Sequence, residues 1–454
     1  GNKTNASFDQ AGFVYSMRDG RRTFINFGFN YHKSKNFDYI LNAASGLNGA
    51  SQHKLSYMKA LANENNLDKT SSGWRGKFAY TSQLDNLYYN TLMMTSSDGF
   101  FYNDASRYEF GRAETGYIDE YDFSTSANVN DRVYLGITIG IHDVHYTGHS
   151  LYNEALVNLN NQTVGDITVN DERRITGTGY NASFGIIFRP VDASPFRIGL
   201  SVTTPTLYDL KTSNYTYLIN NTKADGGGKL QGDYPNYTTG ESYEFKLFTP
   251  WKFGVSLGHT VGNYLALGAS YEYADYSRLD TRVNDGYDVD YWGDVYEHSS
   301  SDEPMNRHTR ETLKAVSTLK IGAEAKVMPN LAVRAGYNYV SPMFKKEGYK
   351  DGNIDSYGSN YSSATDYTNW EATNRYTVGV GYTLGKMSFD LAYQYAQTNG
   401  KFHPFADSYL DYTYPGQDSN GNDVTMTESL DNYANAVNVS NKRNQLLLTL
   451  TYRF

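Results

Sequence analysis

The sequence has no cysteine in its 454 residues. It can therefore form neither a disulfide scaffold nor a thiolate metal site. It also lacks the run of about 18 apolar residues that a transmembrane helix requires. The net charge of −9 leaves no positive excess, which argues against nucleic acid as a partner. The printed sequence shows no signal peptide, as expected of a mature or trimmed form.

Aromatic residues and glycine are abundant, with 43 Tyr, 22 Phe and 41 Gly. A soluble chain of this length usually divides into domains, whereas a large membrane barrel stays one domain because it adds circumference instead of core. Strands that alternate apolar and polar residues keep the mean hydropathy low, and here it is −0.61. The tyrosines suit aromatic girdles at two membrane interfaces. Residues 1–454 are thus expected to form a single all-β, transmembrane antiparallel β-barrel.

The last segment, residues 441–454, gives the clearest strand signal. Period-two alternation places five of its residues on one face: Leu446, Leu448, Leu450, Tyr452 and Phe454. A terminal aromatic that closes such a strand is typical of bacterial outer-membrane barrels. A soluble strand can alternate in the same way, so the recurrence of the pattern decides between the two.

The alternation recurs along the chain, and each occurrence predicts one strand. The thirteen segments are 7–17, 22–35, 115–129, 131–145, 174–189, 196–204, 241–259, 263–277, 311–326, 330–340, 372–384, 386–398 and 441–454. Their second face is small and polar, as expected for a lumen that holds packed side chains or water.

Connections between these segments alternate between short turns and long loops, which is the pattern of periplasmic turns and extracellular loops. The long loops are expected at about 36–114, 146–172, 205–240, 278–310, 341–371 and 399–440. The connection 36–114 is too long for a bare loop. Helical spacing of apolar residues predicts short helices over the barrel mouth at 50–67 and 83–94. The other long loops either contact a ligand or are simply solvated.

Strands 7–17 and 441–454 are expected to run in the same direction, so pairing them would give a parallel seam. Single-chain bacterial barrels have even strand numbers. We therefore expect fourteen strands, with the first strand and the natural N-terminus missing from the printed sequence. The alternative is a strand that the pattern failed to reveal elsewhere.

Three segments resemble the long-chain fatty acid transporter family of the FadL/TodX type, especially its Bacteroidetes branch. They are ITGTGYNASFGIIFRPVDASPFRIGLSVTTPTLYDL (175–210), FTPWKFGVSLGHTVGNYLALGASYEYADYS (248–277) and LAVRAGYNYVSPMF (331–344). With the terminal strand, the resemblance covers most of residues 7–454. It implies a fourteen-stranded barrel with an N-terminal hatch in the lumen. The hatch motif, normally near the mature N-terminus, is not found in the printed sequence. If the protein lacks it, the family's gating does not carry over; if only the printed sequence lacks it, the gating can carry over.

Strand parity directs six charged residues into the barrel: Glu272, Lys320, Glu324, Arg334, Arg375 and Asp390. Charges at membrane depth need water or each other. One interpretation is a network of ion pairs that makes the lumen rigid, and the other is a polar surface that receives a ligand headgroup. The groups Arg375–Asp390 and Lys320–Arg334–Glu324 lie on strands expected to be neighbours.

Two further features concern a metal and a lateral opening. His142 and His145 lie near the outer end of one strand, where they form either a metal site or ordinary polar surface, and the expectation is no metal and no cofactor. Family members look as if they kink the strand that contains Gly28 to open a window toward lipid. A glycine permits a bulge, although other strand glycines do too.

The chain carries no Gly-x-Ser-x-Gly, His-Glu-x-x-His or phosphate-loop motif, so an enzyme is the least favoured hypothesis. The first hypothesis is an outer-membrane protein that transports fatty-acid-like hydrophobic molecules by passive diffusion through a gated barrel, with lateral exit into the membrane. Its partners are membrane lipids and the ligand. The second hypothesis is a docking barrel whose extracellular loops bind another outer-membrane or secretion protein.

Overall fold

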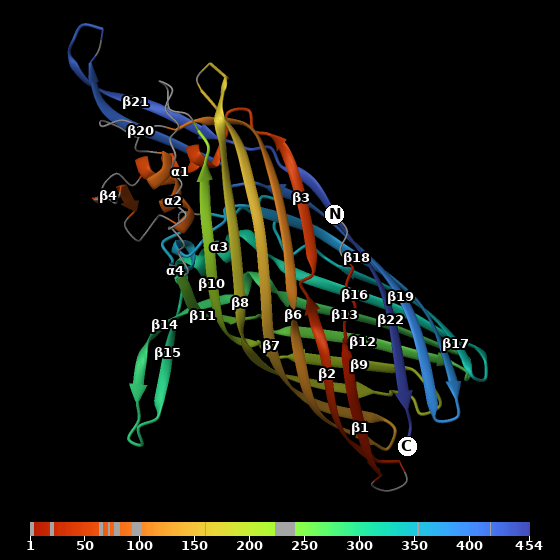
Figure 1. The fold of residues 1–454 in the computed structure, drawn as a ribbon. Coiled ribbons are helices and arrows are strands. Elements are labelled where there is room, and N and C mark those ends of the chain that lie inside the picture. The colour runs from red at the N-terminus through yellow and green to blue at the C-terminus, as the bar shows by residue number, and fades with distance from the viewer. Residues whose placement is uncertain are drawn as a thin grey trace.

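The computed structural model describes the whole chain except residues 1–3, 19–21, 63–66, 71–72, 77–81, 93–101, 159, 223–240, 352–353 and 418. Its main feature is one large antiparallel sheet that curves into a barrel wall (Figure 1). Within the described residues, no helix has the length and apolar character needed to cross a membrane.

Thirteen strands follow one another around this wall in antiparallel ladders. In spatial order they are β1 (Gln10–Arg18), β2 (Phe24–Asn36), β6 (Asp104–Val129), β7 (Val133–Val157), β8 (Thr163–Phe188), β9 (Arg197–Thr203), β12 (Lys252–Val261), β13 (Leu265–Asp275), β16 (Ala315–Met328), β17 (Leu331–Val340), β18 (Tyr367–Leu384), β19 (Met387–His403) and β22 (Val437–Tyr452).

These strands match the thirteen expected segments, so the predicted barrel architecture is confirmed. In the described part of the chain, β1 and β22 are the two edges of the wall, and no ladder joins them. They run in the same direction because each step around the wall is antiparallel. The additional strand expected before residue 7 stays a prediction.

The outer face of the wall is apolar and the inner face is polar. Leu267, Ile321 and Val378 are 45%, 50% and 56% exposed and point outward. Their neighbours along each strand are small or polar and face the lumen. Exposing so many large apolar side chains to water would be unfavourable, whereas a bilayer accommodates them. The chain is therefore an outer-membrane β-barrel protein whose wall spans the bilayer.

Several strands continue far beyond this apolar belt. The prediction of a long loop at 146–172 is wrong, because β7 and β8 continue as a ladder up to a tight turn near residue 160. Residues in the expected 36–114 and 205–240 loops also add β3 (Tyr39–Gly46), the first half of β6 and β10 (Leu207–Asn220). Beyond the bilayer a strand no longer needs a lipid-facing side, so its alternation weakens and the sequence pattern misses it.

Two prolines separate consecutive strands, and Pro250 interrupts the segment 241–259 that the pattern predicts as one strand. Pro205 separates β9 from β10, and Pro250 separates β11 (Glu241–Phe248) from β12. Proline has no N–H to donate to a ladder, so both strands break there. The breaks are adjacent, since the Thr206 N–H donates to Thr249 Oγ1 at 2.8 Å.

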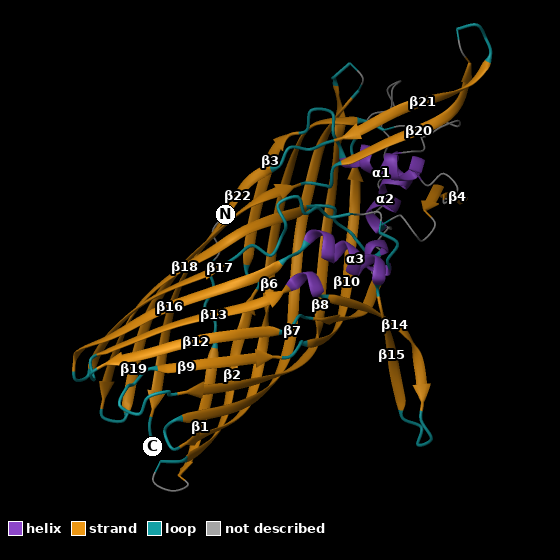
Figure 2. Ribbon diagram, turned by 180° about the vertical axis from the view of Figure 1, so that it is seen from behind, coloured by secondary structure: helices purple, strands orange, loops and turns teal. Residues whose placement is uncertain are grey.

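The remaining elements gather at the end of the barrel opposite its short turns, which we call the loop end (Figure 2). They are α1 (Gln52–Ala62), β4 (Leu67–Thr70), β5 (Gly73–Gly76), α2 (Gln83–Leu92), η2 (Tyr276–Arg278), β14 (Asp280–Val289), β15 (Val295–Ser301), α3 (Glu303–Thr312), α4 (Tyr357–Asn360), β20 (Ser408–Gln417) and β21 (Asp423–Asn432). Helices α1 and α2 lie within the two segments that the spacing predicts as helical. The hairpins β14–β15 and β20–β21 project away from the barrel.

Candidate functional site: lumen and mouth

An ion-pair network links neighbouring strands on the lumen surface of the wall. It lies near the turn end, the end of the barrel that carries the short turns. Arg334 Nε lies 2.6 Å from Glu324 Oε2, and its Nη1 forms an ion pair with Asp390. Glu324 is on β16, Arg334 on β17 and Asp390 on β19, so the guanidinium reaches across β18. Gly381 of β18 leaves this path open, because an added Cβ would lie 2.4 Å from Asp390 Oδ1.

This network brings together three of the six predicted lumen charges, and the other three lie apart from it. The expected Arg375–Asp390 pair does not form. Asp390 is opposite Gly381, whereas Arg375 is opposite Ala396. Six residues of strand separate the two positions, which is about 20 Å.

Lys320 and Glu272 also stay outside the network. Lys320 lies between Ser270 and Asn338 in the ladders, and Glu272 lies between Gly254 and Thr318. Among the described residues, neither side chain forms an ion pair. The ion-pair interpretation therefore applies to Glu324, Arg334 and Asp390, while Glu272, Lys320 and Arg375 remain candidates for ligand contact.

At the loop end, residues 341–351 and 354–366 between β17 and β18 cross the mouth and contact the facing wall. Arg112 of β6 donates to Asp366 at 2.8 Å, and Arg173 of β8 donates to Ser363 at 3.2 Å. We call this segment the crossing loop. Its contacts join residues 190 to 254 positions apart, which no pattern in the sequence reveals.

Helices α1 and α2 cover the mouth beside the crossing loop. Asp85 of α2 is fully buried and accepts from Lys59 of α1 at 2.8 Å. Although burial raises the pKa of this carboxyl, the nearby Lys59 ammonium and hydrogen bonds from Ser56 and Ser82 hold it below its usual value. The pair fixes the two helices to each other.

Glu154, at the far end of β7, holds the start of α1. Its carboxylate accepts from the backbone N–H groups of Gln52 and His53 at 2.9 and 3.2 Å, and from the Tyr152 hydroxyl at 2.8 Å. A helix N-terminus presents unpaired N–H groups and partial positive charge, so a carboxylate stabilises it. Burial raises the pKa of Glu154 to about 7 despite these hydrogen bonds.

An apolar cluster fills the mouth beneath the helices. It includes Leu84 and Tyr88 of α2, Phe110 of β6, and Phe402 and Phe405 near the end of β19. Two cavities beside it have volumes of about 50 and 20 Å³. Both are far below the roughly 300–1,000 Å³ of a typical small-molecule pocket, so neither cavity holds a fatty-acid-like chain. Among the described residues, the crossing loop, the two helices and this cluster cover the mouth.

The histidine pair and the proposed kink are arranged differently from expectation. His142 is buried in the lumen. His145 is exposed on the other face of β7, where its Nε2 lies 3.1 Å from Asp143 Oδ2. Residues three apart on a strand face opposite ways, so this pair cannot share a metal.

Gly28 pairs regularly with Val14 and Ser124. The register shift in β2 lies further along, between Lys33 and Lys35.

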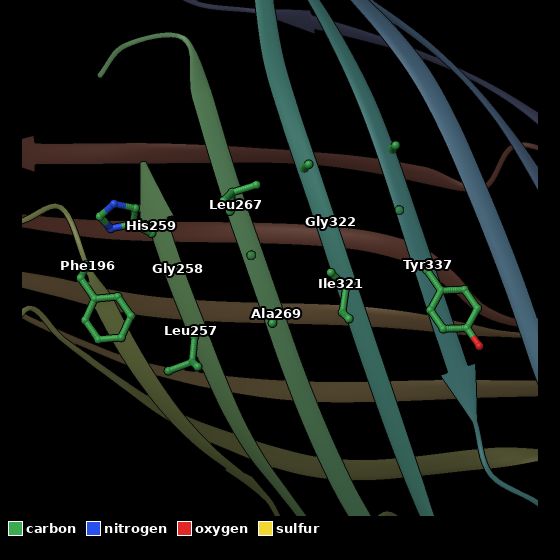
Figure 3. A pocket seen from close by; sticks show the side chains of 13 residues that line it. Phe196, Leu257, Gly258, His259, Leu267, Ala269, Ile321, Gly322 and Tyr337 are labelled. Carbon is green, nitrogen blue, oxygen red and sulfur yellow. The ribbon is translucent and has the colours of Figure 1, made fainter. Parts of the chain in front are cut away.

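A hollow of about 540 Å³ lies on the outer face of β12, β13, β16 and β17 (Figure 3). The small side chains of Ala269 and Ala323 keep its floor low, and Leu257 and Tyr337 stand beside it. Its position on the apolar belt makes it a surface for lipid chains and not a compartment of the lumen.

Solved structures with a similar course of the chain include a Pseudomonas aeruginosa FadL homologue (TM-score 0.44, 14% identity, 98% of this chain and 77% of that chain covered). Two toluene transporters also match over 98% of this chain. TbuX of Ralstonia pickettii has a TM-score of 0.39, 13% identity and 80% of its own chain covered. TodX of P. putida has a TM-score of 0.39, 10% identity and 82% covered. No family model and no curated protein matches the chain.

Proposed function

We propose that this chain transports hydrophobic small molecules of the fatty-acid type across the outer membrane by passive diffusion through a gated barrel. The observation that carries the proposal is the crossing loop, which closes the mouth by contacts to the facing wall at Arg112 and Arg173. The same loop also accepts a hydrogen bond from Asn214 of β10 at the Tyr361 carbonyl and donates one from Thr365 to Gln52. A closure built from a few such contacts can be released without unfolding the barrel.

The apolar cluster around Phe110 and Phe402 supports a hydrophobic ligand. A molecule that enters as the crossing loop moves would meet aromatic and aliphatic side chains before it reaches the polar lumen. Apolar surface gains free energy on leaving water, so the mouth would concentrate such a ligand. Glu272, Lys320 and Arg375, which lie outside the Arg334 network, would then contact its polar headgroup.

The test uses the absence of native cysteine. Arg112→Cys with Asp366→Cys, joined by a reducible bismaleimide, would hold the crossing loop in place. Uptake of a radiolabelled long-chain fatty acid into cells expressing the protein should fall on cross-linking and recover on reduction. The control pair, Tyr287→Cys with Glu297→Cys, faces across the β14–β15 hairpin and should leave uptake unchanged.

Equal uptake of a sugar and of the fatty acid would contradict a route selective for hydrophobic molecules. No uptake of either would favour the second candidate, a docking barrel. The observation behind that candidate is the tip of β14–β15, where Tyr291 and Trp292 are 93% and 84% exposed.

We propose that the ligand leaves the barrel through a lateral opening along β2. Support comes from the register shift between Lys33 and Lys35 and from the short break in the strand between Asn36, where β2 ends, and Tyr39, where β3 begins. Leaving sideways keeps a hydrophobic ligand out of the periplasm. In proteoliposomes, albumin enclosed in the vesicle should not speed the transfer of ligand into the membrane. A transfer that depends on this albumin would rule out lateral exit.

A further inference from the structure

Four potential metal ligands meet on the lumen face of three neighbouring strands. His32 of β2 lies directly opposite Glu120 of β6, and Glu120 lies directly opposite His142 of β7. Asp122 is two residues further along β6 and therefore on the same face. Side chains directly opposite on antiparallel strands have Cβ atoms about 5 Å apart, so the ladder itself brings this group together.

The separations between these side chains suit a common ion. His32 Nε2 is 3.5 Å from Glu120 Oε2, and His32 Nδ1 is 3.4 Å from Asp122 Oδ2. One ligand atom from each of these three residues lies within 4.8 Å of the others. Zinc takes nitrogen and oxygen ligands at about 2.0–2.2 Å in tetrahedral geometry, which places neighbouring ligand atoms about 3.3 Å apart. Small side-chain rotations bring the three to that spacing.

His142 supplies the independent sign of a ligand. The residue is only 5% exposed, and its Nδ1 has no hydrogen-bond partner among the described residues. That Nδ1 faces Glu120 Oε2 at 3.7 Å. A buried ring nitrogen left without a hydrogen bond is costly, and a metal ion would satisfy it.

The surroundings of His142 can fix the tautomer that a metal needs. The Asn181 amide nitrogen Nδ2 lies 2.9 Å from His142 Nε2 and 3.0 Å from the Thr206 hydroxyl, and an amide can be turned over so that its oxygen takes the place of its nitrogen. With the amide oxygen turned toward Nε2, the ring carries its proton there and Nδ1 offers a lone pair. The Thr206 hydroxyl then donates to the same oxygen. Such outer partners are usual for histidines that bind metals.

Space and charge agree with an ion at this place. Gly140 is opposite Asp122, and a Cβ there would lie 2.6 Å from Asn181 Oδ1 and 3.3 Å from Glu120 Oε1. The glycine thus keeps the centre open. Within the described residues, neither Glu120 nor Asp122 forms an ion pair with a lysine or arginine. Lys252 is the nearby cation, and it acts on Glu120 from a longer range.

We propose that His32, Glu120, Asp122 and His142 bind one divalent transition-metal ion of the zinc class inside the barrel. Two imidazoles with two carboxylates favour Zn²⁺, Cu²⁺ or Ni²⁺ over Ca²⁺ and Mg²⁺, which prefer oxygen ligands throughout. The ion ties β2 to β6 and β7 immediately before the register shift at Lys33–Lys35. The site is independent of whether the barrel transports a hydrophobic molecule.

The test is a titration of tag-free, EDTA-treated protein in detergent with Zn²⁺, followed by calorimetry, and with Co²⁺, followed by visible absorption. Wild-type protein should bind one Zn²⁺ per chain and give the intense bands of tetrahedral Co²⁺. The double variant H32A/H142A should bind Zn²⁺ about tenfold or more weakly. The matched control H145A/H149A removes the same number of histidines and should bind like wild type.

Folding is checked by heat-modifiable migration on gels, and Glu120→Gln provides a nearly isosteric second variant that should also weaken Zn²⁺ and abolish the Co²⁺ bands. Equal Zn²⁺ affinity in wild type, H32A/H142A and E120Q would overturn the proposal. Displacement of Zn²⁺ by equimolar Ca²⁺ would overturn the assignment of the metal class.

Discussion

Arg334 and Asp390 form an ion pair although a whole strand, β18, lies between the strands that carry them. The contact depends on Gly381, which has no side chain to block the guanidinium. The same arginine holds Glu324 on its other side, so four consecutive strands are linked across the lumen surface.

Replacing Gly381 with alanine should break the pair. The new Cβ would lie 2.4 Å from Asp390 Oδ1 and 3.0 Å from Arg334 Nη1. We expect the free energy of unfolding in urea to fall by about 1 kcal/mol, a modest loss because the network is open to lumen water. Gly268→Ala is the control, since nothing lies within 4 Å of its added Cβ. A loss of equal size in both variants would contradict the role of Gly381.

Asp366→Asn should loosen the crossing loop. Asp366 is nearly buried against Arg112, and removing its charge leaves a partly buried guanidinium less well satisfied. A local cost of about 2 kcal/mol would raise the open population about thirtyfold. Hydrogen exchange of residues 354–366 and fatty-acid uptake should both rise. The exposed Glu347→Gln in the same loop should change neither, and unchanged exchange in the Asp366 variant would show that the ion pair does not hold the loop.

The start of α1 should become less stable as pH rises. Glu154 has its pKa raised from 4.5 to about 7, so the folded protein binds the proton more tightly than an opened form does. The stabilisation is complete below about pH 4.5 and is lost as pH rises through about 7, a change of about 3 kcal/mol. Hydrogen exchange at residues 52–56, corrected for the intrinsic rate, should follow this course. Glu154→Gln should remove the dependence, and a variant that keeps it would assign the titration to another group.

The two faces of one strand should respond oppositely to added charge. Ala269→Arg places a cation on the lipid face near the middle of β13, where it costs about 2–4 kcal/mol. Ala266→Arg places it in the lumen opposite Glu324, where it should cost little. Unfolding of the refolded barrels in urea measures both. Equal costs would mean that the assigned faces are incorrect.

Period-two alternation was sufficient to locate the thirteen strands that cross the membrane. Each such strand must place one face in lipid and the other in the lumen, so its sequence records its environment residue by residue. Parity also identified Arg334, Glu324 and Asp390 as lumen residues, because their outward neighbours Val333, Ala323 and Leu391 are apolar.

Which of these charges meet was decided by the register between neighbouring strands and by the curvature of the wall in three dimensions. Arg375 was expected to pair with Asp390, but the β18–β19 ladder places it opposite Ala396. The partners Arg112 and Asp366 lie 254 residues apart, and His32 lies 110 residues from His142. The sequence by itself determines which face each residue occupies, because alternation is a local property of the strand. Only the tertiary structure decides which strands lie side by side, in what register, and which loop crosses the mouth, because those contacts join distant segments.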